Sequence, residues 1–273
     1  MKTCREGNGD YSLTAYALQL PGETTLSLDM PVILVDSLTA ARKHVKKSLA
    51  KLLHDEFTAV YDSLSSSLPY KFSPEEVGRR RLRNTCLDYL TSPRTPASGA
   101  ISEKQFNTAD CMTDSIAALG SLVSQPPGTP AREKALADFY NNAGGDALVL
   151  NKWFAIQAFS DHADVLQSVK RLKSHKDFLI SNPNRARSLI SSFAANMEAF
   201  HSKNGAGYEF IADCILELDK LNPQVASRLS GSFSSWRRFD EQRQTLMKRQ
   251  LERILAADGL SKDTFEVVSR SLK

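Results

Sequence analysis

Hydrophobic residues recur at three- and four-residue steps along most of this chain, which is the period of an amphipathic α-helix. The clearest stripe lies within residues 207–221 and consists of Tyr208, Ile211, Ile215, Leu218 and Leu221. These five positions fall on one face of a helix. No regular alternation of strand and helix patterns appears, so a parallel sheet is not expected. The pattern therefore predicts an all-α protein.

A second stripe follows Asp36 or Ser37, either of which is a suitable helix N-cap. It consists of Leu38, Val45, Leu49, Leu52, Phe57 and Val60. We expect these residues to face the core. The preceding residues 12–35 leave two alternatives open. The apolar run at 32–35 is compatible with a short strand interrupted by Pro31, and a helical turn after Pro21 is equally compatible.

Four helix starts share one device, a capping residue followed by proline at the first helical position. They are Ser73-Pro74, Thr129-Pro130, Asn182-Pro183 and Asn222-Pro223. The starts are 56, 53 and 40 residues apart, whereas HEAT and armadillo helix pairs repeat at roughly 40–47 residues. We therefore expect an all-α superhelix of stacked antiparallel helix pairs, a HEAT/armadillo-like solenoid. Residues 1–11 are expected to be a flexible segment, and residues 12–273 a single α-helical domain.

Periodicity and punctuation by proline and glycine also predict where the individual helices lie. The expected helices occupy residues 74–90, 102–109, 112–123, 147–159, 163–173, 207–221, 224–257 and 261–272. Most of them are 8–20 residues long and have short connections.

Composition excludes several classes of protein. The chain has 273 residues, 41% of them hydrophobic, and a net charge of +4, which is ordinary for a soluble globular protein. Its four cysteines are widely spaced, so a zinc site built from them is not expected. Cys86 and Cys214 fall in apolar helical patterns and are expected to be buried thiols. With no membrane-spanning stretch and no signal region, we expect a cytoplasmic protein that binds no membrane.

The familiar catalytic motifs are missing from the sequence. The five histidines include no pair spaced by four residues, the spacing by which two imidazoles of a zinc peptidase reach one metal from one helix face. No GxSxG elbow and no GxxxxGK[ST] phosphate loop occurs. The glycine-rich segment at 204–207 lacks a third glycine and a preceding strand, so we expect a loop that leads into a helix. The sequence thus predicts no catalytic centre and no cofactor in this chain.

Six segments, taken in order, resemble the C-terminal domain of bacterial-type aminopeptidase N. They are EVGRRRLRNTCLDYL at 76–90, MTDSIAAL at 112–119, LNKWFAIQA at 150–158, NPNRARSLI at 182–190, NPQVASRL at 222–229 and RFDEQRQ at 238–244. The resemblance covers about residues 75–273 and, more weakly, 15–60. The chain is one residue shorter than the family pattern near Ala195 and Asn196. That difference leaves the match at Arg228 intact, and the family's loop contacts are not carried over to residues 195–204.

The resemblance implies the terminal helical domain of a zinc aminopeptidase, a metallopeptidase that removes N-terminal residues from peptides. In that family this domain covers the catalytic domain and lines the route to its active site. The zinc would therefore lie in the catalytic domain of the same parent chain, and this chain by itself would be inactive. Its expected partners are that catalytic domain and peptide substrates.

Two arginines are the candidate site residues that the resemblance suggests. Arg187 and Arg228 each follow an Asn-Pro helix start by about one turn. Their guanidinium groups would line the substrate channel and hold peptide carboxylates or carbonyls. An equally weighted alternative is that each arginine braces two stacked helices. Trp153 and Trp236 are expected to pack between helices.

A free-standing helical-repeat interaction module is the competing interpretation. It would use a basic surface made of Arg79, Arg80, Arg81, Arg83, Arg237, Arg238, Arg243, Lys248 and Arg249. Acidic residues such as Asp240, Glu241 and Glu252 interleave the later cations, which favours a solvated helix face over a phosphate-binding stripe. Nucleic acid is therefore not an expected partner.

Overall fold

The structure of the protein is a computed structural model, which describes residues 10–65 and 69–273 of the chain. Within those residues β-pairing is limited to one isolated parallel bridge between Ile33 and Phe239. The chain divides into two compact units. Of the described residues, the first contains 10–22, 40–65 and 69–142, and the second contains 23–39 and 143–273. Residues 1–9 of the expected flexible segment lie outside the described residues.

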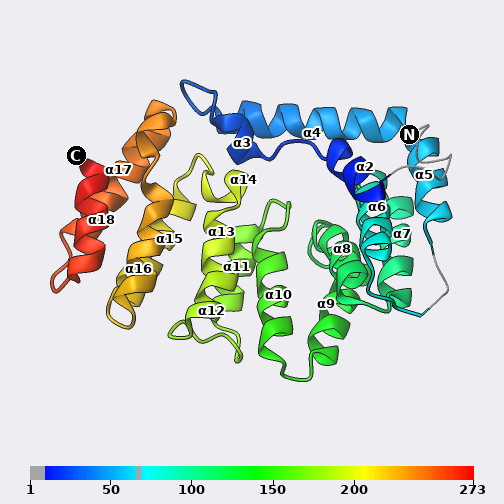
Figure 1. Ribbon diagram of the computed structural model, residues 1–273. Coiled ribbons are helices and arrows are strands. Elements are labelled where there is room, and N and C mark those ends of the chain that lie inside the picture. Colours follow the sequence, from blue (N-terminus) through cyan, green and yellow to red (C-terminus); the bar gives the residue numbers. More distant parts are fainter. Residues whose placement is uncertain (1–9, 66–68) are drawn as a thin grey trace. The chain divides into compact units, whose positions relative to one another are not determined.

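The first unit is built from helices that follow one another along the chain (Figure 1). They are α2 (Tyr11–Leu18), most of α4 (Val35–Leu52), α5 (His54–Ser63), α6 (Pro74–Leu90), α7 (Pro96–Thr108), α8 (Met112–Val123) and α9 (Pro130–Asn142). The long helix α6 contacts α2, α5 and α8, and α7 contacts α8. This unit therefore consists of neighbouring helix pairs around α6.

The core of the first unit lies along the apolar face of α6. Leu82, Cys86 and Leu87 are at most 1% exposed, and the rings of Phe57 and Tyr89 stack with centroids 4.5 Å apart. The N-terminus of α6 is capped as expected, because the Ser73 hydroxyl accepts a hydrogen bond from the Glu76 N–H at 3.2 Å. Local capping and apolar periodicity together fix this helix.

The second unit contains the remaining helices. They are α3 (Glu23–Ser27), the start of α4, α10 (Ala147–Ala158), α11 (Val165–Lys173), α12 (Pro183–Ala186), the π-helical η1 (Arg187–Ser191), α13 (Ser192–Ala194), α14 (Met197–Phe200), α15 (Ala206–Asp219), α16 (Pro223–Ser230), the 3₁₀ turns η2 (Gly231–Phe233) and η3 (Trp236–Arg238), α17 (Glu241–Leu255) and α18 (Lys262–Leu272). Segments α12, η1 and α13 follow one another without a break, and α15 contacts both α16 and α17.

A cluster of aromatic rings forms much of the core of the second unit. Phe193, Phe200, Tyr208 and Phe233 are at most 1% exposed, and Phe200 meets the Tyr208 ring edge to face at 5.1 Å. Such edge-to-face pairs are worth about 0.5–1.5 kcal/mol beyond the area that they bury. Four residues of the expected stripe, Tyr208, Ile211, Ile215 and Leu218, are at most 1% exposed in α15, but Leu221 lies beyond the end of this helix and is 54% exposed.

Two expected helix positions are wrong. The helix expected over 224–257 is interrupted between α16 and α17, because Phe239 adopts an extended backbone and Ile33 N–H donates to the Arg238 carbonyl at 2.6 Å. Asp240 then caps a new helix by accepting from Arg243 N–H at 3.1 Å. The helix expected at 102–109 begins earlier, at Pro96, where Thr95 acts as the cap.

The expected stripe that follows Asp36 is correct only in part. Phe57 and Val60 are buried, but Val45 is 45% and Leu52 is 77% exposed. One helix ends at Leu52 and the next begins at His54, so the residues do not share a single face. The helix also begins at Val35, one residue before the expected cap. Of the alternatives for 12–35, the helical turn after Pro21 is present as α3.

Other expectations from the sequence are confirmed. Cys86 and Cys214 are buried and form no disulfide, and burial raises the pKa of Cys214 to about 12. Trp153 and Trp236 are each 8% exposed. The Trp236 indole donates to the Ser271 carbonyl at 2.8 Å, so this ring joins η3 to the end of α18.

Candidate functional site

Arg187 lies where a regular helix becomes π-helical. The side chain of Asn182 caps α12 by accepting from the N–H groups of Asn184 at 3.0 Å and Arg185 at 3.2 Å. Leu189 and Ile190 of η1 are fully buried, whereas the Arg187 side chain is exposed. π-helical turns occur often at functional sites. Nothing in the sequence pattern indicates this turn.

Arg228 occupies a comparable place in α16. Asn222 caps the helix by accepting from Val225 N–H at 3.2 Å. Ala226 and Leu229 face the core, and Arg228 is exposed on the other side. The two arginines therefore extend from the solvent face of helices that begin with the same Asn-Pro device.

Neither the Arg187 side chain nor the Arg228 side chain forms a hydrogen bond or ion pair with any residue in the described ranges 10–65 and 69–273. In this part of the chain, therefore, no hydrogen bond or ion pair supports the alternative that each arginine braces two stacked helices. The segment η1 packs on α10 and α11, while α16 packs on α15 and α18. The structure thus places the two arginines on separate helix pairs, and each retains the planar, charged fork that matches a carboxylate or a carbonyl oxygen.

Arg185 belongs to the same Asn-Pro segment but has a different environment. Its side chain is 7% exposed and its guanidinium carbon lies 5.1 Å from the centre of the Phe154 ring. The Nη1 atom is buried without a hydrogen-bond partner, and burial lowers the pKa of this guanidinium. Arg185 is therefore buried, whereas the Arg187 side chain, two residues later, is exposed to solvent.

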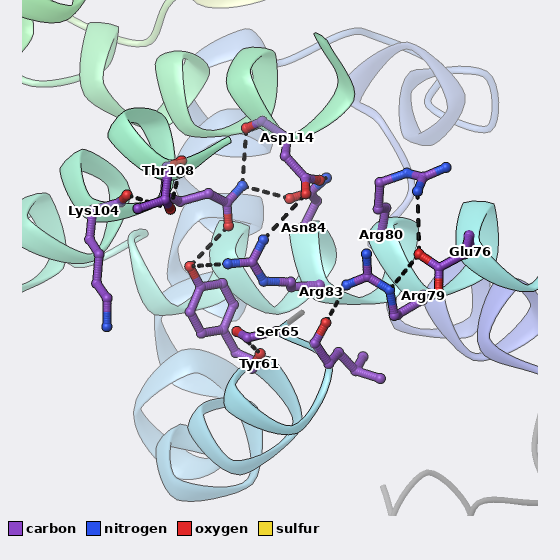
Figure 2. A network of polar contacts seen from close by, with 12 residues as sticks. Tyr61, Ser65, Glu76, Arg79, Arg80, Arg83, Asn84, Lys104, Thr108 and Asp114 are labelled. Atoms are coloured by element: carbon purple, nitrogen blue, oxygen red, sulfur yellow. Dashed lines mark hydrogen bonds and ion pairs between the residues drawn. The ribbon is translucent and has the colours of Figure 1, made fainter. Parts of the chain in front are cut away.

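The arginines of α6, expected on a basic surface in the competing interpretation, mostly make internal contacts. Figure 2 shows Arg79 and Arg80 turned toward Glu76, with N–O distances of 2.9 and 3.5 Å. Arg79 also donates to the Leu64 carbonyl. Arg80 is 4% exposed and donates to the Lys71 carbonyl at 3.2 Å.

Arg83 belongs to a polar network that joins four helices of the first unit. Its guanidinium donates to the Tyr61 hydroxyl at 3.2 Å and to the Asp114 carboxylate at 3.3 Å (Figure 2). Gln105 accepts from Tyr61 at 2.9 Å and donates to Asn84 at 2.8 Å. Asn84 in turn donates to Asp114 at 2.8 Å. Desolvation raises the pKa of Tyr61, although the positive charge of Arg83 opposes it.

Two arginines of the later basic stretch cap neighbouring backbone segments. Arg238 donates to three carbonyl groups at the end of α3, those of Ser27, Leu28 and Met30, at 2.6–3.1 Å. Arg237 donates to the carbonyls of Ser271 at 2.6 Å and Leu272 at 2.7 Å. These contacts leave the proposed basic interaction surface with few free cations.

Arg243 is the most deeply buried of these cations, with a relative exposure of 2%. Its Nε donates to the His201 carbonyl at 2.7 Å, and its two terminal nitrogens bind Asp240 at 2.7 Å and Asp36 at 3.0 Å. Burial, reinforced by the charge of Arg243, lowers the pKa of His201 to about 3. The neutral imidazole lies 2.9 Å from the Tyr208 hydroxyl.

In residues 10–65 and 69–273, no three His, Cys, Asp or Glu side chains lie together in a way that could hold a metal ion. No helix within those ranges is both long and apolar enough to cross a membrane.

Comparison with known proteins decides the family. Residues 2–273 match the model of a family described as a domain of unknown function (DUF3458_C) with ARM repeats. The chain belongs to the DUF3458_C family. This DUF3458_C chain is 39% identical over 265 residues to aminopeptidase N of Haemophilus influenzae and 36% identical over 264 residues to that of Escherichia coli. These matches cover 97% and 96% of the chain, but 30% of each relative.

A solved structure supports the same relationship. The crystal structure of Legionella pneumophila aminopeptidase A in complex with aspartic acid matches 99% of the DUF3458_C chain with a TM-score of 0.88 and 29% identity. The match spans 32% of that protein. The all-α repeat fold and the resemblance to the C-terminal domain of aminopeptidase N are therefore confirmed. Because the matched relatives are about three times longer, a domain of an aminopeptidase is favoured over a free-standing module.

Proposed function

We propose that this chain serves a zinc aminopeptidase by covering its catalytic domain and lining the channel through which peptides reach the active site. The match to aminopeptidase N over nearly the whole chain is the observation that carries this proposal. The catalytic domain, with its zinc ion, would be part of the same longer chain. In the described part of the chain Cys86, Cys111 and Cys214 form no disulfide, which is compatible with the reducing cytoplasm as its location.

Within this role, Arg187 and Arg228 are the proposed contacts to substrate. Both are exposed and free of intramolecular ion pairs in the described part of the chain. In the proposed role their guanidinium groups bind the carbonyl or carboxylate groups of a peptide in transit. A charge-assisted hydrogen bond of this kind is worth about 1.5–3 kcal/mol.

The first test uses the 273-residue chain alone. We expect no hydrolysis of an aminoacyl reporter and no stoichiometric zinc by elemental analysis, because the sequence contains no pair of zinc-binding histidines at helical spacing. Zinc-dependent hydrolysis by the pure chain, abolished by a chelator, would contradict the proposal.

The second test places this chain in the Haemophilus influenzae enzyme, in exchange for the matching 265 residues. We expect the chimera to hydrolyse both a small aminoacyl reporter and longer peptides. Arg187→Ala and Arg228→Ala should each lower kcat/KM for a pentapeptide about tenfold. The reporter is too short to reach the channel and should be unaffected. Arg249→Ala, which removes another exposed arginine, is the matched control.

The comparison between substrates decides the outcome of this second test. An equal loss on both substrates would indicate a structural defect rather than a channel contact. No loss on the pentapeptide would exclude the two arginines from substrate binding, even if the chimera is active.

A further inference from the structure

A groove of about 650 Å³ opens on the first unit, whereas Arg187 and Arg228 belong to the second unit. Helices α4, α6 and α8 and the segment after α2 provide its walls. Its volume lies in the range of small-molecule sites, about 300–1,000 Å³. The groove is thus large enough for a short peptide, and it belongs entirely to one unit.

The charged groups that line the groove are three cations and one carboxylate: Arg42, Lys46, Arg81 and Asp88. Lys46 lies 2.7 Å from Asp88 and neutralises it. Arg42 donates to the Pro21 carbonyl at 2.7 Å. After the Lys46–Asp88 pair is formed, the guanidinium of Arg81 remains as a positive charge of the lining, which attracts an anion and repels a cation.

Arg81 differs from the other arginines of α6. Arg79, Arg80 and Arg83 are held by carboxylates and carbonyl groups within the unit. The Arg81 side chain makes no hydrogen bond or ion pair with a residue in 10–65 or 69–273. Instead its guanidinium carbon lies 4.6 Å from the centre of the Tyr16 ring.

Stacking on Tyr16 has a chemical consequence. A guanidinium group that rests on an aromatic face keeps its plane fixed while its N–H donors at the edge remain free. Two parallel N–H groups match the two oxygens of a carboxylate. Because the side chain lies at the groove, this preorganised fork is available to a ligand there.

The remaining lining suggests what carries the carboxylate. Leu20, Val77 and Ala117 provide apolar surface, and Gln19 and Thr113 add neutral polar groups. Ligand sites commonly combine apolar walls with a few polar groups that fix orientation. An apolar side chain next to a terminal carboxylate fits such a lining better than a small, fully hydrated anion does.

We propose that this groove binds the C-terminal carboxylate of a short peptide, with Arg81 as the bidentate donor. The carboxylate chemistry follows from the groove itself, while the choice of a peptide as its carrier rests on the proposed aminopeptidase role. The Lys46–Asp88 pair keeps the one acidic group of the lining from repelling the ligand. The apolar residues accept the last side chain of the peptide.

The test is direct binding to the full chain, which requires no catalysis and so stays separate from the activity of the chimera. The probes for calorimetric titration are N-acetyl-trialanine with a free carboxylate, its C-terminal amide, acetate and inorganic phosphate. We expect the acid to bind at least tenfold more tightly than the amide. Arg81→Gln should weaken binding of the acid at least tenfold, and Tyr16→Leu several-fold. Arg249→Gln, the same change at an exposed position of α17, should leave the affinity unchanged.

Each contrary result overturns a defined part of this proposal. Equal affinity for acid and amide, or no binding of either, excludes a carboxylate site, and this comparison needs no variant. Unchanged binding by a folded Arg81→Gln protein excludes Arg81 as the donor. Acetate or phosphate binding as tightly as the peptide acid excludes the peptide as the ligand and leaves a small-anion site.

Discussion

Replacing Arg243 with alanine removes a cation that joins three segments of the second unit. The guanidinium binds the His201 carbonyl, the Asp240 carboxylate and the Asp36 carboxylate. Asp36 and Arg243 are 207 residues apart in the sequence. This contact therefore holds the start of α4 against α17.

The expected cost follows from the exposure of each partner. The His201 carbonyl loses a donor in a buried position, which costs about 1–3 kcal/mol. The Asp240 side chain is 29% exposed and keeps its capping bond to the backbone, so the loss of its ion pair with Arg243 costs about 1 kcal/mol. Asp36 is 56% exposed and keeps Lys203 at 3.2 Å, so it adds little. With the lost contacts of the buried stem, the total is about 3–5 kcal/mol, as found when one partner of a buried ion pair is removed.

Urea denaturation at pH 7, monitored by circular dichroism, measures this change in the free energy of unfolding. Arg249→Ala is the matched control, because it deletes an exposed arginine six residues later in the same helix and should change stability by less than about 0.5 kcal/mol. A loss below about 1 kcal/mol for Arg243→Ala, or an equal loss in the control, would refute the assignment of Arg243 as a buried connector.

Three further predictions concern stability. The His201 pKa is about 3 in the folded chain and about 6.5 in the unfolded chain, so stability should be complete above pH 6.5 and fall as the pH decreases toward 3. The loss from this group is about 2 kcal/mol at pH 5, and His201→Gln should abolish it in denaturation curves recorded between pH 7.5 and 5. Gly207→Ala should destabilise the folded chain by about 2–3 kcal/mol, because a Cβ at this position would lie 2.4 Å from the Phe200 carbonyl oxygen. Gly231→Ala is the control and should leave stability unchanged, because a Cβ there would have no atom within 4 Å. Similar melting temperatures for the two variants would contradict this prediction. Arg185→Met should change stability by less than about 1 kcal/mol or increase it, because its buried Nη1 has no partner, while a loss above 2 kcal/mol in urea would show that the guanidinium contributes to the fold.

Much of the fold was predictable from local signals. Ser73, Asn182 and Asn222 cap helices as expected, because a cap depends on residues two or three positions away. The stripe of 207–221 corresponds to the buried face of α15, except for Leu221, which follows the helix and is exposed. Where a prediction failed, distant groups decided the conformation. Between α16 and α17 the Arg238 carbonyl accepts a hydrogen bond from the Ile33 N–H. No sequence pattern within 224–257 reveals this bond, because Ile33 lies far away in the sequence.

The candidate site was predictable in part. Family-like motifs directed attention to Arg187 and Arg228, and the structure shows both as exposed. The motifs did not distinguish them from Arg185, which is buried two residues before Arg187. They also gave no sign of the π-helical turn at Arg187 or of the Arg81 groove, because neither a backbone hydrogen-bond shift nor a groove between helices leaves a periodic signal.

The sequence by itself determined where most helices begin, which faces are apolar and to which family the chain belongs, since capping, periodicity and motif order are local or collinear properties. Only the tertiary structure decided which arginines are internal and which are free. The partners of Arg83 and Arg243 lie 31 and 207 residues away, and a cation is neutralised only where folding brings a carboxylate or a carbonyl to it. Arg81, Arg187 and Arg228 remain free in the described part of the chain because folding brings none to them.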